Sequence, residues 1–244
     1  MKKNKTNFMI ATIMLFLLFL FSIFKFDVIE KLLIFAIKPK DFFVARESLF
    51  ELARQHIFIV AVSSSLSVLI AVCIAILTRF PIMNELEEFI LGIAIFGQTI
   101  PTVAILALLV PFLGYGFKPA LVALFIYGIL PVLRNTIEGL NTISEDVRES
   151  ARAMGMSPFQ VMSKVELPLA FPAILAGVRV SLILNISVAT IGATVGLKGF
   201  GILIVNGIRS DDIILILKGA IPVSLLALTV ESLFMHLEKK FRLP

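Results

Sequence analysis

Long runs without a charged residue are the feature that most constrains the fold of this chain. Residues 8–24, 57–78 and 89–117 contain no Asp, Glu, Lys or Arg over 17, 22 and 29 positions. A helix that crosses the hydrocarbon core of a bilayer needs about 20 apolar residues. The composition agrees, because 59% of the 244 residues are hydrophobic and 16% are charged, whereas a soluble domain has about 45–50% and about 25%. The sequence therefore predicts an all-α integral membrane protein.

We expect about six transmembrane helices, separated by charged residues, prolines or glycines. They are residues 8–24, 57–78, 89–117 with a bend near Pro101, 119–134, 172–195 and 213–237. The fourth is close to the lower length limit for a span. A cleavable signal peptide is the alternative for the first run, but its apolar region has about 7–15 residues and a small-residue cleavage site. The segment "KFDVIEK" follows instead, which favours an uncleaved span.

The segment between the first two spans is mixed in charge and partly amphipathic. Phe43, Phe50 and Ile57 recur at seven-residue spacing. This pattern predicts a helix that lies along the membrane surface and leads into the second span.

The distribution of Lys and Arg predicts the orientation. Six spans place both termini on one side, and basic residues flank both ends of the chain. With these ends inside, 12 cations are inside and 10 outside, but six of the outside ones lie with five acidic residues in segment 25–56. Without that segment, 12 cations are inside and 4 are outside, and short loops follow the positive-inside rule best. We therefore expect cytoplasmic termini, with the polar insert between the fourth and fifth spans on the same side.

The first half of this insert has the signals of a short helix. Ser144 is a suitable N-cap and two acidic residues follow it, which suits the positive end of the helix dipole. Val147, Ala151 and Met154 share one face, and Gly155 predicts the stop, because glycine readily adopts the left-handed conformation.

The second half has the signals of another helix start. Ser157, Pro158 and Gln160 form the pattern of a capping box with proline at the first helical position. Pro168 predicts that this helix ends by Leu167. The physical pattern is that of a helix–turn–helix, and an amphipathic connector of no further purpose remains the alternative.

The insert resembles the cytoplasmic motif of bacterial ATP-binding cassette (ABC) importer permeases. That motif is Glu-Ala-Ala, three residues, Gly, nine residues, then Ile-x-Leu-Pro. This chain has Glu149-Ser150-Ala151, Gly155 and Val165-Glu166-Leu167-Pro168 at the same spacings, with Ser150 and Val165 as conservative departures. The resemblance implies a coupling helix that docks on a separate ATPase. The implied ATPase-coupling residues are Glu149, Ser150, Ala151, Met154, Gly155, Leu167 and Pro168.

A wider resemblance covers about residue 48 to the C-terminus. "GQTIPTVAILAL", "GFKPALVALFIYGILPVLRNTIEGL" and "VELPLAFPAILAGVRVSLILNI" look like permeases of glycine betaine, choline and carnitine importers. "ARESLFELARQHIFIVAVSS" is similar to the low-affinity glycine betaine (Yeh/Osm-type) branch. One departure is "VGLKGFG", where a more glycine-rich turn without Lys198 is expected. The resemblance implies an N-terminal anchor and surface segment (1–47) and a permease domain (48–244), with a five-helix MetI-like permease core.

Polar residues within the spans are the candidates for lining a pathway. They are Gln98, Thr99, Asn185, Ser187, Thr190 and Thr194, and Ser63, Ser64 and Ser67 mark the second span. Such residues also hold transmembrane helices together, and this packing interpretation is the slightly favoured one. Arg179, Lys218 and Glu231 lie near span ends and are interpreted as topology anchors.

No catalytic constellation, metal site or phosphate loop of the form G-x-x-x-x-G-K-[ST] occurs in the sequence. The resemblance therefore implies a non-catalytic subunit without a bound cofactor, whose partner ATPase uses ATP and Mg. It implies three kinds of partner: ABC ATPase subunits, a second permease chain, identical or paralogous, and an extracytoplasmic solute-binding protein in a bacterial inner membrane. We expect no nucleic-acid partner, because the cations mostly flank apolar runs.

The sequence alone leaves the solute open. The chain has no Trp and two tyrosines, so a high-affinity aromatic cage for a quaternary ammonium group is disfavoured. An ABC permease for an amino acid or a thiol betaine is one alternative. An ion-driven secondary transporter is another, for which Glu231 is the candidate carboxylate.

Overall fold

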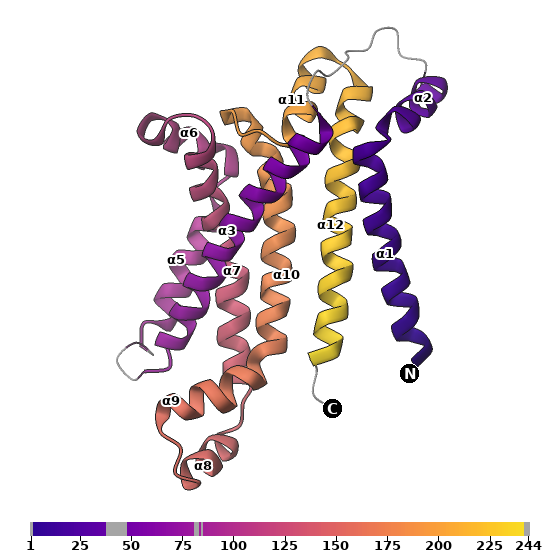
Figure 1. Cartoon of the computed structure of the whole chain (residues 1–244). Coiled ribbons are helices and arrows are strands. Elements are labelled where there is room, and N and C mark those ends of the chain that lie inside the picture. Colours follow the sequence, from indigo (N-terminus) through magenta and orange to yellow (C-terminus); the bar gives the residue numbers. More distant parts are fainter. Residues whose placement is uncertain (1, 38–47, 81–82, 84, 242–244) are drawn as a thin grey trace.

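The computed structural model describes residues 2–37, 48–80, 83 and 85–241, and these contain helices and no strand (Figure 1). The elements are α1 Lys2–Phe24, α2 Phe26–Ile37, α3 Leu49–Leu77, α5 Glu87–Thr99, α6 Thr102–Leu113, α7 Phe117–Asn141, α8 Glu145–Ala153, α9 Pro158–Val161, α10 Leu167–Ile191, α11 Phe200–Ser210 and α12 Ile213–Phe241. A π-helical segment, Met162–Glu166, joins α9 to α10, and a 3-10 turn, Gly192–Val195, follows α10. This architecture confirms the predicted all-α fold class.

Four single helical stretches are long and apolar enough to cross a membrane: α3, α7, residues 158–195 and α12. Two bent pairs also qualify, α1 with α2 at 82° and α5 with α6 at 92°, which gives up to six spans among the described residues. The prediction of about six spans agrees with the upper number. The bend predicted near Pro101 is confirmed, because α5 ends at Thr99 and α6 begins at Thr102.

The fourth predicted span is longer than expected. Helix α7 continues past Arg134 to Asn141, so the charge at Arg134 does not end it. Arg134 pairs with Glu138 one turn later at 2.8 Å, and both side chains are exposed. The helix thus continues beyond the apolar run with its charged pair exposed and with Thr136, Ile137 and Leu140 buried on its other face.

Helices α3, α7 and α10 form the packed centre of the molecule. Small residues allow α7 and α10 to approach closely: a Cβ atom on Gly177 would lie 2.8 Å from the carbonyl oxygen of Pro131. A Cβ atom on Gly139 would lie 2.7 Å from the Cβ atom of Ala173. Small residues at such crossings are typical of transmembrane helix packing.

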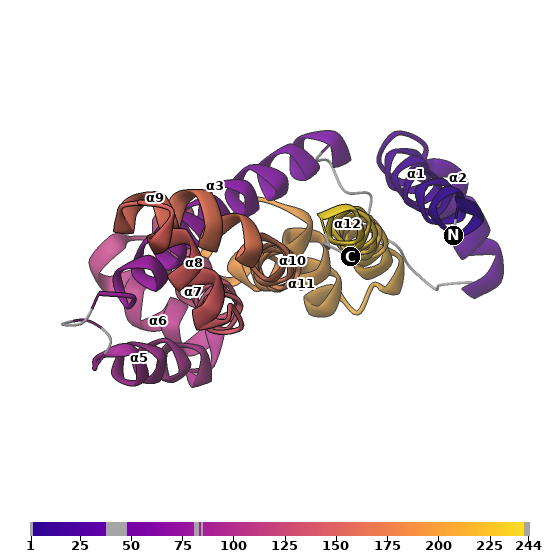
Figure 2. The same ribbon diagram turned by 90° about the horizontal axis from the view of Figure 1, so that it is seen from below.

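The N-terminal helix lies at one edge of the molecule and packs mainly on α12. Figures 1 and 2 both place α1 beside α12, and α5 and α6 at the opposite edge. Phe19 of α1 is buried in one cluster with Leu215 of α12. A hydrogen bond of 2.6 Å joins the hydroxyl groups of Thr12 and Ser232.

The structure has no separate surface helix at Phe50 and Ile57, where the sequence predicted one. Phe43 lies outside the described residues, while Phe50 and Ile57 belong to α3, which runs without a break into the second span. The helix that turns away from its neighbour is α2, bent by 82° from α1. An ion pair of 3.0 Å between Glu30 and Lys218, both largely buried, ties α2 to α12.

The predicted end of the second insert helix at Leu167 is wrong. Residues 158–195 form one helical stretch, which contains Pro168 and starts well before the predicted fifth-span boundary at Pro172. Proline inside an α-helix lacks an N–H donor and clashes with the carbonyl four residues earlier. The π-helical segment Met162–Glu166 widens the turn immediately before Pro168, which relieves this conflict. The insert is therefore continuous with a membrane span.

Candidate functional site

Helix α8 begins where the sequence predicted. Ser144 occupies the N-cap position with extended backbone angles, but its side chain makes no capping hydrogen bond, contrary to the expectation. The acidic residue after it serves a different purpose, because Glu145 pairs with Arg148 at 3.0 Å and with Arg152 at 3.2 Å. The hydrogen bond from Arg148, together with the charge of Arg152, lowers the pKa of the Glu145 carboxyl group.

The turn after α8 has the predicted glycine conformation. Gly155 has φ of +80°, and its N–H donates to the carbonyl of Arg152 at 2.9 Å. A Cβ atom at this position would meet nothing within 4 Å. The requirement for glycine is therefore conformational rather than steric, since a residue with a Cβ disfavours the left-handed region.

The capping box at the start of α9 is confirmed. The backbone N–H of Gln160 donates to the hydroxyl of Ser157 at 3.3 Å, and the N–H of Ser157 donates to the amide oxygen of Gln160 at 2.8 Å. Pro158 stands at the first helical position. These reciprocal bonds fix the direction in which the chain leaves the turn.

A buried ion pair holds α8 against the base of α10. The Nε atom of Arg148 donates to Glu166 at 2.5 Å, and the two side chains are 13% and 8% exposed. A terminal nitrogen of Arg148 also donates to the carbonyl of Leu140 at 2.8 Å. Arg148 therefore joins the end of α7, the length of α8 and the π-helical segment at one point.

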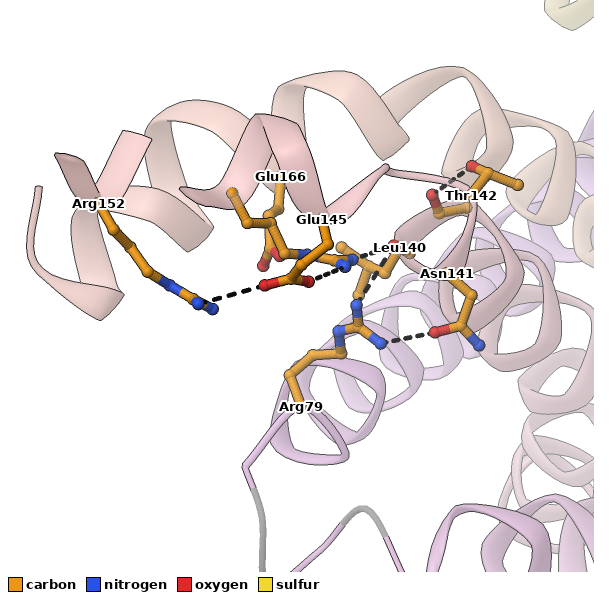
Figure 3. A network of polar contacts seen from close by, with 9 residues as sticks. Arg79, Leu140, Asn141, Thr142, Glu145, Arg152 and Glu166 are labelled. Atoms are coloured by element: carbon orange, nitrogen blue, oxygen red, sulfur yellow. Dashed lines mark hydrogen bonds and ion pairs between the residues drawn. The ribbon is translucent and has the colours of Figure 1, made fainter. Parts of the chain in front are cut away.

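A second arginine supports the same helix end. Arg79, after α3, donates to the side chain of Asn141 at 2.6 Å and to the carbonyl of Leu140 at 3.3 Å (Figure 3). The last carbonyls of a helix have no partner within the helix. The two arginines satisfy the carbonyl of Leu140 and fix α3, α7 and the insert relative to one another.

The candidate coupling residues divide into exposed and buried ones. Glu149 and Ser150 are exposed, and Met154 is 71% exposed, whereas Ala151 is 2% exposed and packs inward. Leu167 is half-buried and Pro168 is exposed. Beside the insert lies a groove of about 830 Å³. Its lining includes Arg79, Arg148 and Phe159, and the side chain of Phe159 is 80% exposed. Charged, small and apolar side chains of the insert are thus exposed on a helix that Arg148 and Glu166 hold in place.

The candidate pathway residues do not form a single group. Ser187 and Thr194 are exposed and Thr190 is half-buried. The hydroxyl of Thr190 donates to the carbonyl of Ser187 at 2.6 Å, and that of Thr194 donates to the carbonyl of Ile191 at 2.8 Å. Asn185 is fully buried. Side chains two positions apart in an α-helix point about 200° apart around the helix axis, so Asn185 faces away from Ser187.

The other two candidates lie on α5. Gln98 donates to the carbonyl of Tyr127 on α7 at 3.1 Å, and exposed Thr99 donates to that of Phe96 at 2.7 Å. The hydroxyl of Tyr127 donates to the carbonyl of Ile100, at the bend between α5 and α6. Gln98 and Tyr127 thus bind backbone groups beside this bend.

Asn185 belongs to a buried polar seam, which we define as Ser63, Ser64, Ser67, Ser181 and Asn185 around Gly128. The amide nitrogen of Asn185 donates to Ser64 at 2.9 Å and to Ser63 at 3.4 Å. Ser67 donates to the carbonyl of Phe125 on α7 at 3.2 Å. The seam therefore joins α3, α7 and α10 through neutral polar groups, which supports the packing interpretation for Asn185.

Two titratable side chains within the long helices, Arg179 and His56, are held in contacts with other helices. Arg179 bridges Glu231 at 2.6 Å and Glu238 at 2.8 Å, both on α12. His56 is fully buried, lies against the ring of Phe200, and has its Nε2 atom 3.2 Å from the carbonyl oxygen of Ile186. Within the described residues, no three or more His, Cys, Asp or Glu side chains are grouped so as to hold a metal ion.

Known proteins share this architecture. An inward-facing methionine ABC transporter, MetNI, matches with a TM-score of 0.70 at 22% identity, over 80% of this chain and 96% of that one. An amino acid ABC transporter crystallised with histidines matches with a TM-score of 0.63 at 17% identity, over 79% and 93%. At these identities the likeness concerns the fold, and it agrees with the expected permease core.

Relatives of known description are more similar in sequence. A carnitine transport permease protein from Listeria monocytogenes is 43% identical over 72% of this chain and 80% of its own length. A choline transport system permease protein from Bacillus subtilis is 40% identical over 76% and 85%. An osmoprotectant import permease protein from Salmonella typhimurium is 35% identical over 77% and 88%.

A family model covers the same part of the chain. The model described as "binding-protein-dependent transport system inner membrane component" matches residues 67–243, which include the insert and the four long helical stretches apart from the start of α3. This match and the relatives confirm the resemblance noted in the sequence. The chain therefore belongs to the family of binding-protein-dependent transport system inner membrane components, which are permeases of ABC transporters.

Proposed function

We propose that this chain is the permease subunit of an ATP-driven importer for small osmoprotectants of the quaternary ammonium or betaine type. The observation that carries the proposal is identity of 35–43% over most of the chain to permeases described as carnitine, choline and osmoprotectant transporters. The low-affinity glycine betaine branch stays a prediction within this class. We place the chain in a bacterial inner membrane with cytoplasmic termini, as the cation distribution favours.

In this proposal the insert is the docking surface for the ATPase. Glu149, Ser150 and Met154 are exposed on one side of a helix whose position is fixed by Arg148 and Glu166. Methionine and small residues suit a surface that is pressed against a partner. The partner ATPase supplies the chemistry of ATP and Mg, and this chain binds neither.

The same geometry transmits movement. Residues 158–195 form one helical stretch, so a displacement of the insert moves α10 directly. We propose that ATP binding closes the ATPase pair, draws two inserts together and opens the spans outward, and that hydrolysis resets them. Such a shift requires different contacts in the two states, and the insert supplies them.

A second permease chain completes the pathway in this proposal. The supporting observation is that Bacillus subtilis has two different choline system permeases, and both are similar to this chain, at 40% and 39% identity. A solute-binding protein outside the membrane delivers the solute. The ion-driven alternative is not favoured, because its candidate carboxylate, Glu231, is paired with Arg179.

Uptake assays test the proposed function. The chain is expressed with its partner proteins in a bacterium that lacks its own osmoprotectant uptake, and radiolabelled glycine betaine, choline and carnitine are supplied. The proposal predicts uptake of at least one of them that stops on ATP depletion and persists when the ion gradient is dissipated. Uptake of an amino acid instead would reject the solute class, and uptake that follows the ion gradient would reject the mechanism.

A further inference from the structure

A second pocket lies at the end of the helix bundle opposite the insert, and the proposed function does not use it. It has a volume of about 420 Å³ and lies between the start of α3, the start of α7 and the turn after the 3-10 segment. Figure 1 shows the start of α3 at the end of the molecule away from α8 and α9. Arg54, Gln55, Phe58, Phe117 and Lys198 line the pocket. We call it the distal pocket. Its volume is within the range of about 300–1,000 Å³ that is usual for small-molecule sites.

The position of Lys198 in the distal pocket is set by the backbone around it. Gly196 has φ of +83°, and the N–H of Leu197 donates to the carbonyl of Gly192 at 3.0 Å. Leu197 is 6% exposed and packs into the core, so the turn is anchored on that side. The exposed neighbour, Lys198, then lines the pocket.

The turn is also tied to α7. The N–H of Gly116, the residue before α7, donates to the carbonyl of Val195 at 2.7 Å. This bond connects two walls of the distal pocket and holds Phe117 beside the lysine-bearing turn. The pocket is therefore bounded by backbone contacts rather than by mobile side chains alone.

The charged groups of the distal pocket have unused donors. Arg54 engages Glu51 through Nε at 3.0 Å and Nη2 at 2.8 Å, while its Nη1 atom donates to no described residue. Lys198 makes no hydrogen bond or ion pair with any residue that the structure describes, although the carboxylate of Glu51, which Arg54 binds, is close enough to interact with its charge. Arginine and lysine without a full set of partners are suited to binding a carboxylate.

An aromatic pair stands beside these cations. The ring centroids of Phe58 and Phe117 are 5.9 Å apart, and the side chains are 59% and 39% exposed. A quaternary ammonium group is attracted to an aromatic face within about 6 Å of its centroid. Phenylalanine pairs give a weak site, which agrees with the absence of a tryptophan cage in the sequence.

We propose that the distal pocket is a weak subsite for a zwitterionic quaternary ammonium solute. The carboxylate lies between Lys198 and Arg54, and the ammonium group lies against Phe58 and Phe117. The inference rests on the proposed function for the solute class. It adds a selectivity between solutes that carry a carboxylate and choline, which carries none. Choline is a cation, so it has no group to bind Lys198 and is repelled by the positive charge of Lys198. The pocket thus favours glycine betaine or carnitine over choline.

Direct binding tests this inference without reference to transport. The permease–ATPase complex is prepared in lipid nanodiscs without the solute-binding protein. Saturation-transfer NMR then measures the binding of glycine betaine and of choline at millimolar concentrations. The expected result is tighter binding of glycine betaine. Lys198→Gln weakens it by about tenfold, the effect of one charge-assisted hydrogen bond, and Lys198→Glu reverses the preference. Lys118→Gln is the matched control, because this exposed lysine at the same end does not line the pocket.

Phe58→Leu separates the two halves of the subsite. It removes the aromatic face while the cations remain, so it weakens the binding of both solutes and leaves the effect of Lys198 in place. Equal binding by wild type and Lys198→Gln, or a preference of the wild type for choline, overturns the proposal. A separate measurement adds the solute-binding protein to the same nanodiscs. If Lys198→Glu lowers only the affinity of that protein for the complex, an acidic side chain of the protein occupies the pocket and the proposal is overturned.

The two proposals fail in different experiments. If the wild type transports none of the three osmoprotectants but still binds glycine betaine through Lys198, the proposed function fails and the subsite stands. If uptake of glycine betaine is normal and no binding depends on Lys198, the subsite fails and the proposed function stands.

Discussion

The insert network and the buried polar seam hold the same three helices together by different means. The insert network joins the ends of α3, α7 and α10 with charges, chiefly the Arg148–Glu166 pair. The seam joins the same helices inside the bundle with serines and an asparagine. Charge is costly inside a bilayer, where neutral polar groups serve as glue. Between α3, α7 and α10, ion pairs therefore stand at the end that carries the insert and neutral polar groups stand inside the bundle, whereas the Glu30–Lys218 and Arg179–Glu231 pairs tie α12 to its neighbours elsewhere.

Removing one partner of the Arg148–Glu166 pair has the largest expected effect on this comparison. Glu166→Ala removes the more buried carboxylate of Arg148 and leaves Glu145 and the carbonyl of Leu140 as its partners, so the cost is about 3 kcal/mol, the low end of the range for breaking a buried pair. Because α8 then loses its attachment to the base of α10, we also expect loss of the bound ATPase. Thermal unfolding of the purified chain and co-purification of the ATPase measure the two effects.

Glu138→Ala is the matched control for that variant. Glu138 forms a pair with Arg134 of 2.8 Å, but both side chains are exposed, so the cost is about 0–1 kcal/mol. The account of the insert network is wrong if the two variants are equally stable and equally able to bind the ATPase.

Gly128→Ala is the next test and concerns the seam. A Cβ atom there would lie 2.8 Å from side-chain atoms of Ser67, Ser181 and Asn185. Such overpacking costs about 1–3 kcal/mol, and it separates α7 from α3 and α10. Gly92→Ala on α5 is the control, because a Cβ there meets nothing within 4 Å. A midpoint of thermal unfolding that falls equally in both variants, or in neither, would contradict a close-packed seam.

Two serine substitutions give a smaller, opposite pair of effects within the seam. Ser64→Ala removes an acceptor of Asn185 and costs about 0.6 kcal/mol, the average for such bonds between membrane helices. Ser181→Ala removes a hydroxyl that is buried without a hydrogen-bond partner among the described residues, so it is neutral or stabilising. Chemical denaturation of both variants measures this. The assignment of hydrogen bonds fails if Ser181→Ala is the more destabilising.

The smallest expected effect is a pH dependence confined to the insert. The pKa of Glu145 is lowered from 4.5, mainly by the hydrogen bond from Arg148. A carboxyl group with a lowered folded-state pKa contributes stability above its unfolded pKa, and this is lost as pH falls through the folded pKa. The protection factors of the α8 amides, which are corrected for the intrinsic exchange rate at each pH, should therefore fall in acid below about pH 4.5. Glu145→Gln should show no such change, and an identical acid response in that variant would remove Glu145 as the cause.

Most local parts of the insert could be predicted from sequence, apart from the Ser144 cap and the helix end at Leu167, and the long-range parts could not. Ser157, Gln160 and Gly155 act on backbone groups within a few residues, so their spacing is sufficient. The Arg148–Glu166 pair joins positions 18 residues apart, and only the packing of α8 on α10 brings them together. A charged residue within an otherwise apolar helical turn, "VELP", is the signal that could have indicated a buried partner for Glu166.

The spans show the same division. The apolar runs predicted the spanning helices correctly, but the helix ends that were predicted from charge and proline are wrong. Helix α7 continues past Arg134, and the helix after the insert continues through Pro168 because a π-helical segment precedes it. The opposite faces of Asn185 and Ser187 follow from helical geometry alone. Which of the two faces is buried depends on the position of α3, and that is a property of the tertiary structure.

The most direct test of the central claim is affinity purification of the tagged chain from its native membranes in mild detergent, with and without Gly155→Leu. The substitution forces a residue with a Cβ into φ of +80°, a strain of about 1–2 kcal/mol, at an exposed turn that leaves the spans intact. We predict that an ABC ATPase co-purifies with the wild type and is lost from the variant. Recovery of the wild type without an ATPase, or a variant that keeps the ATPase and normal uptake, would contradict the claim that the insert couples this permease to ATP hydrolysis.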